Sequence, residues 1–168
     1  MNYFLKFATL LLMVSVAFSS CKKDEDDTPA PSTPQTSLFD LTKSNSGYLY
    51  YQSGALLPGT SPSPHGSFKL RFNDIAQAAL DTAGKLPTGS SFPENSLIVK
   101  ELFTNGTLEL LAIMRKKPTD GNAGSGWVWA EYKPDGTEVY SESKKGAACI
   151  SCHSSTKNRD LLKTFDLH

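Results

Sequence analysis

The chain has 168 residues, of which 39% are hydrophobic, and its 17 basic and 17 acidic side chains give a formal net charge of zero. This length accommodates one domain of ordinary size. No basic stripe runs along the sequence, so we exclude nucleic-acid binding.

The first 20 residues predict an export signal. Lys6 provides a short positive region, and an apolar run follows over residues 7–18 (FATLLLMVSVAF). This run is shorter than the roughly 20 apolar residues of a membrane-spanning helix. Two serines then precede Cys21, which resembles a bacterial lipobox. We therefore predict a lipoprotein-type signal peptide over residues 1–20 and lipidation of Cys21. The alternative is an ordinary secretory signal that is cleaved at the same place.

Residues 22–37 (KKDEDDTPAPSTPQTS) predict a disordered tether. The segment is acidic at first, then rich in Pro, Thr and Ser, and it has almost no apolar side chains that could offset the entropy of folding. Residues 21–37 are therefore predicted to comprise the lipidated Cys21 and this tether. A folded domain is expected over residues 38–168. We expect the protein in the bacterial cell envelope, lipid-anchored to the membrane and facing the periplasm or the cell surface.

The folded part begins with short elements. Residues 38–52 predict a short helix followed by an aromatic strand, and residues 53–66 form a proline-punctuated loop. Apolar and basic residues alternate over residues 68–72 (FKLRF), which predicts a strand. Asn73 is then an expected N-cap for a helix whose apolar residues recur at helical spacing as far as Ala83.

Residues 96–103 (SLIVKELF) and 108–116 (LELLAIMRK) predict a β-hairpin. Asn105-Gly106 at its centre favours a two-residue type I′ turn. If the threonines that flank this turn pair, one face of the hairpin carries eight side chains, of which only that of Glu101 is not apolar. This face comprises Leu97, Val99, Glu101, Phe103, Leu108, Leu110, Ala112 and Met114, and the mixed opposite face comprises Ile98, Lys100, Leu102, Glu109, Leu111, Ile113 and Arg115.

Two further strands are expected after the hairpin. Residues 127–132 (WVWAEY) predict one strand, and the turn at 134–136 (PDG) leads into another over residues 137–140. The predicted fold class is mainly β (α+β): an antiparallel sheet with a few short helices and a C-terminal c-type haem motif.

Cys149-Ile150-Ser151-Cys152-His153 matches C-x-x-C-H, the attachment sequence of c-type haem. Each thiol can add to one vinyl group on the same porphyrin edge, and the histidine can then bind the iron. Three alternatives compete: a zinc site, a thioredoxin-like dithiol and a local Cys149–Cys152 disulfide. A zinc site would need more ligands than the chain offers, a thioredoxin-like dithiol would need a βαβ pattern, and a disulfide would not explain the histidine. We therefore favour one covalently attached haem c. Its cofactor-binding residues would be Cys149, Cys152 and His153, and His153 would be the iron ligand.

A C-x-x-C-H motif late in a β-rich chain resembles the cytochrome P-460 family, which is related to cytochrome c′-β. The resemblance rests on residues 92–101 (FPENSLIVKE), 126–129 (GWVW), 134–136 (PDG) and 149–153 (CISCH) and covers roughly residues 65–166. It implies a β-sheet domain, often a homodimer, with one haem and an open distal side. Some members carry a lysine–porphyrin bond and oxidise hydroxylamine, and others bind gases such as nitric oxide. Lys69, Lys100 and Lys116 are the lysines on candidate strands.

Other residues are candidates for the site. Glu101 is the candidate catalytic residue, as a distal proton relay; the favoured alternative is a carboxylate paired within the sheet. Glu131 is expected to be either exposed or directed into a pocket. Met114 and His65 are conceivable sixth iron ligands, but we expect Met114 in the core and His65 exposed.

The main hypothesis is therefore an exported c-type monohaem protein with redox or small-ligand chemistry, involving hydroxylamine or nitric oxide, at an open iron. It would be an enzyme of the hydroxylamine-oxidising type if the lysine–haem bond exists. The alternatives are a six-coordinate electron-transfer cytochrome whose partner is another redox protein, or a haem-free binding lipoprotein with a Cys149–Cys152 disulfide.

Overall fold

A computed structural model describes residues 36–43, 47–61, 64–155 and 157–168. The predicted signal peptide, the lipidation site Cys21 and nearly all of the predicted tether lie outside these ranges. Among the described residues, no helix is both long and apolar enough to span a membrane.

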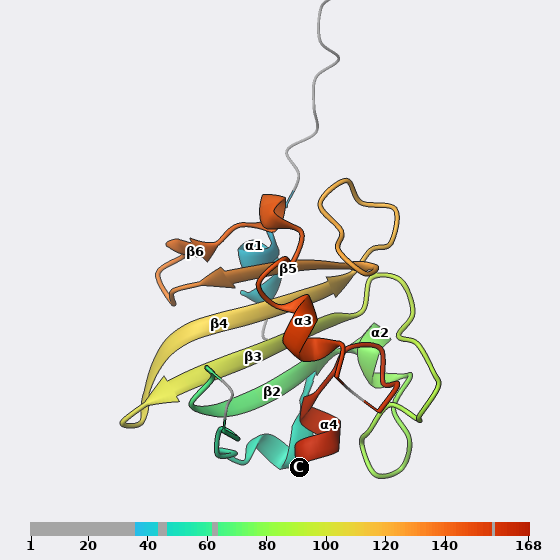
Figure 1. Cartoon of the computed structure of the whole chain (residues 1–168). Helices are drawn as coiled ribbons and strands as arrows, with labels where there is room; N and C mark the ends of the chain where they lie inside the picture. Colours follow the sequence, from blue (N-terminus) through green and yellow to red (C-terminus); the bar gives the residue numbers. More distant parts are fainter. Residues whose placement is uncertain (1–35, 44–46, 62–63, 156) are drawn as a thin grey trace, which may run out of the picture. The chain divides into compact units, whose positions relative to one another are not determined.

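The described chain forms a six-stranded antiparallel sheet in the order β1-β2-β3-β4-β5-β6, so every strand pairs with its neighbour in sequence (Figure 1). The elements are α1 (Leu38–Thr42), β1 (Tyr48–Tyr50), the 3₁₀ helix η1 (Tyr51–Gly54), β2 (Ser67–Asn73), α2 (Asp74–Gln77), β3 (Leu97–Thr104), β4 (Thr107–Lys116), β5 (Trp127–Tyr132), β6 (Glu138–Tyr140), the 3₁₀ helix η2 (Glu142–Lys144), α3 (Ile150–His153) and α4 (Thr164–Leu167). The predicted fold class, mainly β with a few short helices, is confirmed.

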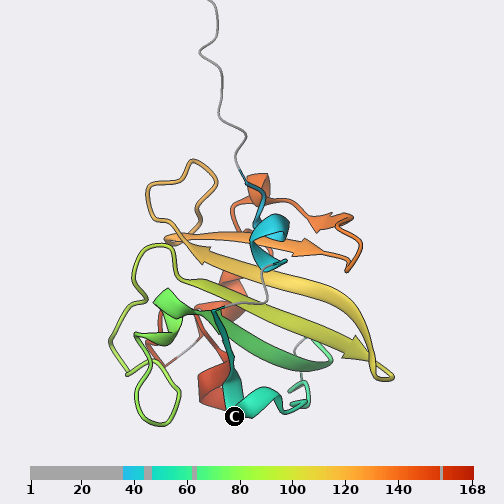
Figure 2. The same cartoon turned by 180° about the vertical axis from the view of Figure 1, so that it is seen from behind.

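Each face of the sheet has its own apolar cluster. Helices α3 and α4 lie over one face (Figure 1), and α1 covers the opposite face (Figure 2). The first cluster includes Phe72, Trp127, Trp129 and Phe165, whereas the second is built around Val99 and its neighbours on β4 and β5. The sheet is therefore buried on both sides, and the two faces can serve different purposes.

The helix predicted after Asn73 is shorter than expected. Asn73 caps it as predicted, because its side-chain oxygen accepts a hydrogen bond from Ala76 N at 3.0 Å. However, α2 ends at Gln77, and the following turn is closed by the Asp81 carboxylate, which accepts hydrogen bonds from Ala83 N and Lys85 N. An aspartate that bonds to nearby backbone in this way competes with helix continuation.

The hairpin forms as predicted, but the register expected for most of its length is wrong. Thr104 pairs with Thr107 and Phe103 with Leu108, yet Leu102 pairs with Leu110. One extra residue on β4 makes a β-bulge, and because side chains alternate in period two, every pair beyond it is shifted. Glu101 therefore lies opposite Leu111, and beyond the bulge the even-numbered residues of both strands share the face under α3 and α4.

Glu101 lies among polar side chains on the α1 side of the sheet. Its Oε1 atom lies 2.9 Å from Arg71 Nε and accepts a hydrogen bond from Tyr50 Oη at 3.0 Å. Arg71 Nη2 also donates to Thr42 O at 3.0 Å. Both members of the ion pair are nearly buried, with 7% of the Arg71 side chain and 12% of the Glu101 side chain exposed. The pair therefore ties β1, β2 and β3 to the end of α1.

We predict that Glu101→Ala destabilises the domain by about 3–5 kcal/mol, because it leaves the buried Arg71 guanidinium without its counter-ion. Chemical unfolding followed by circular dichroism measures this loss. Glu109→Ala is the matched control, since Glu109 is exposed on β4, and it should leave the unfolding free energy nearly unchanged. Equal stability of the two variants would contradict a structural role for Glu101.

Candidate haem site

A cavity of about 580 Å³ lies on the face of the sheet that α3 and α4 cover. This volume is within the range of cofactor pockets. Apolar side chains from four adjacent strands line it: Phe68 and Leu70 on β2, Ile98 and Leu102 on β3, Leu110, Ala112 and Met114 on β4, and Trp129 on β5. The rest of the wall comes from residues 59–61, 64 and 65, from Lys100, Ile113, Ala130, Glu131 and Tyr140, and from residues 148, 149, 152, 153, 162–164, 167 and 168.

Both thiols of the C-x-x-C-H motif lie at this cavity. Cys149 is the N-cap of α3 and is half-buried, and Cys152 is exposed on the same helical turn. Both are free thiols, so the structure does not contain the alternative Cys149–Cys152 disulfide. Burial, together with the negative charge of Glu131, raises the pKa of the Cys149 thiol.

His153 is held by one hydrogen bond and one ring contact. Its Nδ1 atom lies 2.7 Å from Leu161 O, and its ring meets the Trp129 ring edge-on at 5.1 Å between centroids. A carbonyl oxygen can only accept, so the proton sits on Nδ1, and Nε2 keeps the lone pair that a metal requires. Burial lowers the pKa of His153, which favours this neutral form.

Trp129 fixes the approach of the chain to α3. Its Nε1 donates to Gly124 O at 3.1 Å, and its ring packs so closely on Gly146 that a Cβ atom there would lie 2.4 Å from the ring. Gly146 also has a φ of 67°, which side-chain-bearing residues rarely adopt. Ala148 N then donates to Tyr140 Oη at 3.2 Å. Trp129 is a core residue, and the structure places it directly against the motif.

Among the three lysines considered from the sequence, only Lys100 lies at the cavity. Its amine lies 3.9 Å from the centroid of the Phe68 ring. Burial lowers the pKa of Lys100 to about 8, although the negative charge of a Cys152 thiolate acts to raise it. The Lys69 amine lies over the Phe103 ring, and Lys116 forms an ion pair with Asp160 at 2.7 Å. A buried amine with a lowered pKa is more often neutral, and therefore more nucleophilic, than an exposed one.

Several other titratable side chains line the same cavity. His65, expected to be exposed, is half-buried there, and burial together with the positive charges of Lys100 and His153 lowers its pKa to about 4. Glu131 takes the pocket-facing alternative, and burial raises its pKa. Met114 lines the cavity as part of the core. Glu101, in contrast, is not among the lining residues, and its placement does not support a role as a distal relay.

Two contributors to the site carried no signal in the sequence. Leu161 acts through its main-chain carbonyl, which any residue type could provide. His168, which lies at the cavity with its ring 5.4 Å from that of Phe68, follows no motif. The contact of Leu161 with His153 and the position of His168 at the cavity become apparent in the folded chain.

These residues fit a haem. The cavity offers apolar walls for a porphyrin, two thiols three positions apart at its border, and one imidazole with an available nitrogen. In contrast, the described part of the chain contains no group of three or more His, Cys, Asp or Glu that could hold a bare metal ion, which leaves the zinc alternative without a ligand set there.

The fold and the site together define a class: haem proteins built on an antiparallel sheet, with the haem-attachment motif near the end of the chain. Residues 58–164 match the family model for cytochrome P460. The match covers more than half of the chain, so the protein belongs to the cytochrome P460 family. No curated protein matches the chain. Membership supports a haem cofactor with its iron and agrees with the resemblance read from the sequence.

We predict that Gly146→Ala destabilises the protein by about 1–3 kcal/mol through its left-handed backbone alone, with the Trp129 contact adding to this loss. The same change should lower the fraction of protein that acquires haem, because α3 is displaced. Thermal unfolding and the haem-to-protein absorbance ratio measure the two effects. Gly121→Ala is the control, since a Cβ atom at Gly121 meets nothing within 4 Å. Normal haem content in Gly146→Ala would contradict this positioning role.

Proposed function

We propose that the protein is an exported c-type monohaem protein whose iron binds small nitrogenous ligands such as nitric oxide or hydroxylamine. Cys149 and Cys152 would hold the haem covalently, and His153 would be the proximal iron ligand. The observation that carries this proposal is the 2.7 Å hydrogen bond from His153 Nδ1 to Leu161 O, which leaves Nε2 as the metal-binding nitrogen at an apolar cavity.

When bound, the haem supplies an iron that can take up a ligand and exchange electrons. The residues of the chain contribute in other ways. The apolar walls exclude water, which strengthens electrostatic interactions within the cavity. Lys100, Glu131 and His65 are among the titratable groups that line the cavity and would hold or pass protons for a bound ligand. Burial raises the pKa of Glu131, which is the direction that favours a carboxyl group as a proton donor.

Lys100 is the residue to which we assign the lysine–porphyrin bond, if the chain forms one. The bond would replace one N–H of the amine and one C–H of the porphyrin with an N–C bond. This step is a two-electron oxidation, and we propose hydrogen peroxide as the oxidant: it would take up the two electrons and the two protons and leave as two molecules of water. With the bond, hydroxylamine oxidation is the expected activity; without it, reversible gas binding is expected.

A six-coordinate electron-transfer cytochrome is the second candidate function. It is favoured by the half-buried His65, whose lowered pKa keeps the imidazole neutral, and by Met114 in the same cavity. In this case a redox protein would be the partner. The haem-free binding lipoprotein has less support, because it depended on a disulfide between two thiols that are free.

The proposed location follows from residues 1–37 alone. The apolar run before Cys21 supports export and a lipid anchor, and an envelope location agrees with c-type haem, which is attached outside the cytoplasm. We also propose that the protein forms a homodimer. This part of the proposal is supported by the resemblance to dimeric members of the family.

Coexpression with a cytochrome c maturation system tests the main proposal. We predict one covalent haem per chain, absent from Cys149→Ser/Cys152→Ser, and a reduced spectrum that changes on addition of nitric oxide. The double variant is the control for non-covalent haem. Covalent haem with a low-spin spectrum insensitive to nitric oxide would favour the six-coordinate carrier, and no covalent haem would exclude both functions.

Peptide mapping and reduced spectra of Lys100→Arg test the lysine assignment. We predict that the wild-type reduced Soret band is strongly red-shifted, that trypsin leaves Lys100 joined to the haem peptide, and that Lys100→Arg abolishes both signs. Lys69→Arg, with the same change at a lysine outside the cavity, should abolish neither. A red shift that survives in Lys100→Arg would exclude Lys100, and an unshifted wild-type band would place the protein among the gas-binding members.

A further inference from the structure

The segment that follows α3 has an unusual backbone. Asn158, Asp160 and Leu161 have φ angles of 56°, 47° and 69°, although none of them is glycine. A left-handed conformation costs a residue with a side chain on the order of 1–3 kcal/mol, and it persists only where the surroundings impose it. Leu161 is also the residue whose carbonyl accepts the hydrogen bond from His153. Contacts that hold this segment therefore act on the proposed iron ligand.

Asp160 makes the central contacts of this segment. Its Oδ1 atom accepts hydrogen bonds from Lys116 Nζ at 2.7 Å and Trp127 Nε1 at 3.2 Å, and its Oδ2 atom accepts one from Phe92 N at 2.8 Å. The side chains of Lys116 and Asp160 are only 12% and 9% exposed. This ion pair therefore fixes Asp160 to the paired ends of β4 and β5, directly before Leu161.

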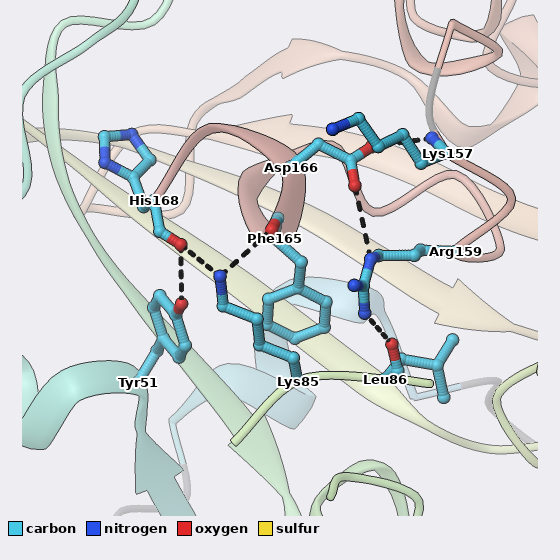
Figure 3. Close-up of polar contacts among 8 residues, drawn as sticks. All are labelled: Tyr51, Lys85, Leu86, Lys157, Arg159, Phe165, Asp166 and His168. Carbon is cyan, nitrogen blue, oxygen red and sulfur yellow. Dashed lines mark hydrogen bonds and ion pairs between the residues drawn. The ribbon is translucent and has the colours of Figure 1, made fainter. Parts of the chain in front are cut away.

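Further contacts hold the segment from the other side (Figure 3). Arg159 contacts Leu86 O through Nη1 and lies 3.2 Å from Asp166 through Nε. Asp166 in turn accepts a hydrogen bond from Lys157 N at 2.7 Å. Asn158 O accepts one from Gly89 N at 2.7 Å. The polar contacts of Asp160 with Lys116 and Trp127 join the segment to β4 and β5, two of the strands that form the cavity wall.

We propose that the Lys116–Asp160 ion pair is a positioning device for His153: it holds Leu161 O against Nδ1 and thereby sets how strongly His153 donates to the haem iron. Neither Lys116 nor Asp160 is among the residues that line the cavity. The inference rests on the proposed function, since it requires haem at His153.

The direction of the effect follows from the hydrogen bond. An imidazole whose N–H is held by an acceptor is a more basic ligand, and a more basic axial ligand stabilises the ferric iron. Loss of the ion pair would let Asp160 and Leu161 relax towards ordinary φ values. The hydrogen bond from His153 Nδ1 to Leu161 O would then lengthen. The reduction potential would then rise, and the iron–histidine stretching frequency would fall.

Two single substitutions with opposite charge changes test this proposal. Asp160→Asn removes a negative charge and puts an amide group against Phe92 N, and Lys116→Met removes a positive charge. A purely electrostatic influence on the iron would shift the reduction potential in opposite directions. The positioning role predicts that both variants raise it. We expect about a tenfold higher ratio of reduced to oxidised protein at a fixed solution potential, about 59 mV for a one-electron couple.

Resonance Raman spectra of the ferrous protein should show a lower iron–histidine frequency in both variants. Lys116→Arg keeps the positive charge beside Asp160 and should therefore retain the wild-type frequency. Asp135→Asn, in an exposed turn, is the matched charge control and should change neither measurement. If a charged variant fails to fold, Trp127→Phe removes one hydrogen bond to Asp160 without a change of charge and should shift both measurements in the same direction.

Opposite potential shifts, or an unchanged iron–histidine frequency, in protein that carries covalent haem would overturn the positioning role alone. A wild-type protein without covalent haem would instead overturn the proposed function. The two failures are therefore distinguishable.

Discussion

The β-bulge in the β3–β4 hairpin is the constraint on which the cavity depends. One additional residue on β4 shifts the pairing of the two strands by one position, and this shift decides which β4 side chains share a face with Lys100. Leu110, Ala112 and Met114 thereby line the proposed haem site beside Lys100, whereas Glu101 on the other face pairs with Arg71. Without the bulge, Leu110 would lie opposite Glu101 and on its face of the sheet, away from the cavity that it now lines.

The sequence predicted the strands and the hairpin turn because both depend on local chemistry. Alternating apolar residues and an Asn-Gly pair favour their conformations wherever they occur. The bulge has no such local signal, since Glu109 is an ordinary strand residue by type. The same difference applies to the site. Cys149, Cys152 and His153 form one contiguous motif and were predicted together, whereas His65, Lys100 and Glu131 come from three separate elements and meet only when the sheet has formed.

The same residue types also change meaning with their surroundings. Lys69, Lys100 and Lys116 could not be distinguished in the sequence, because each lies on a strand. In the fold, Lys69 lies outside the cavity over an aromatic ring, Lys100 is half-buried at the cavity, and Lys116 forms an ion pair with an aspartate. Burial and the nearest charge decide whether an amine is a cation or a nucleophile, and neither can be read from the residue type.

The two buried ion pairs of the sheet lie on different faces and have different consequences. Desolvation offsets much of the attraction within any buried pair, so stability alone is a weak reason for either. Arg71–Glu101 joins strands that already pair with each other. Lys116–Asp160 instead joins the sheet to a segment whose backbone is left-handed at three residues with side chains. A geometry that is unfavourable for the segment itself must be imposed by its contacts. Because the imposed position is that of the carbonyl bonded to His153, the ion pair is better explained by the proposed role of His153 as proximal ligand than by the stability of the fold.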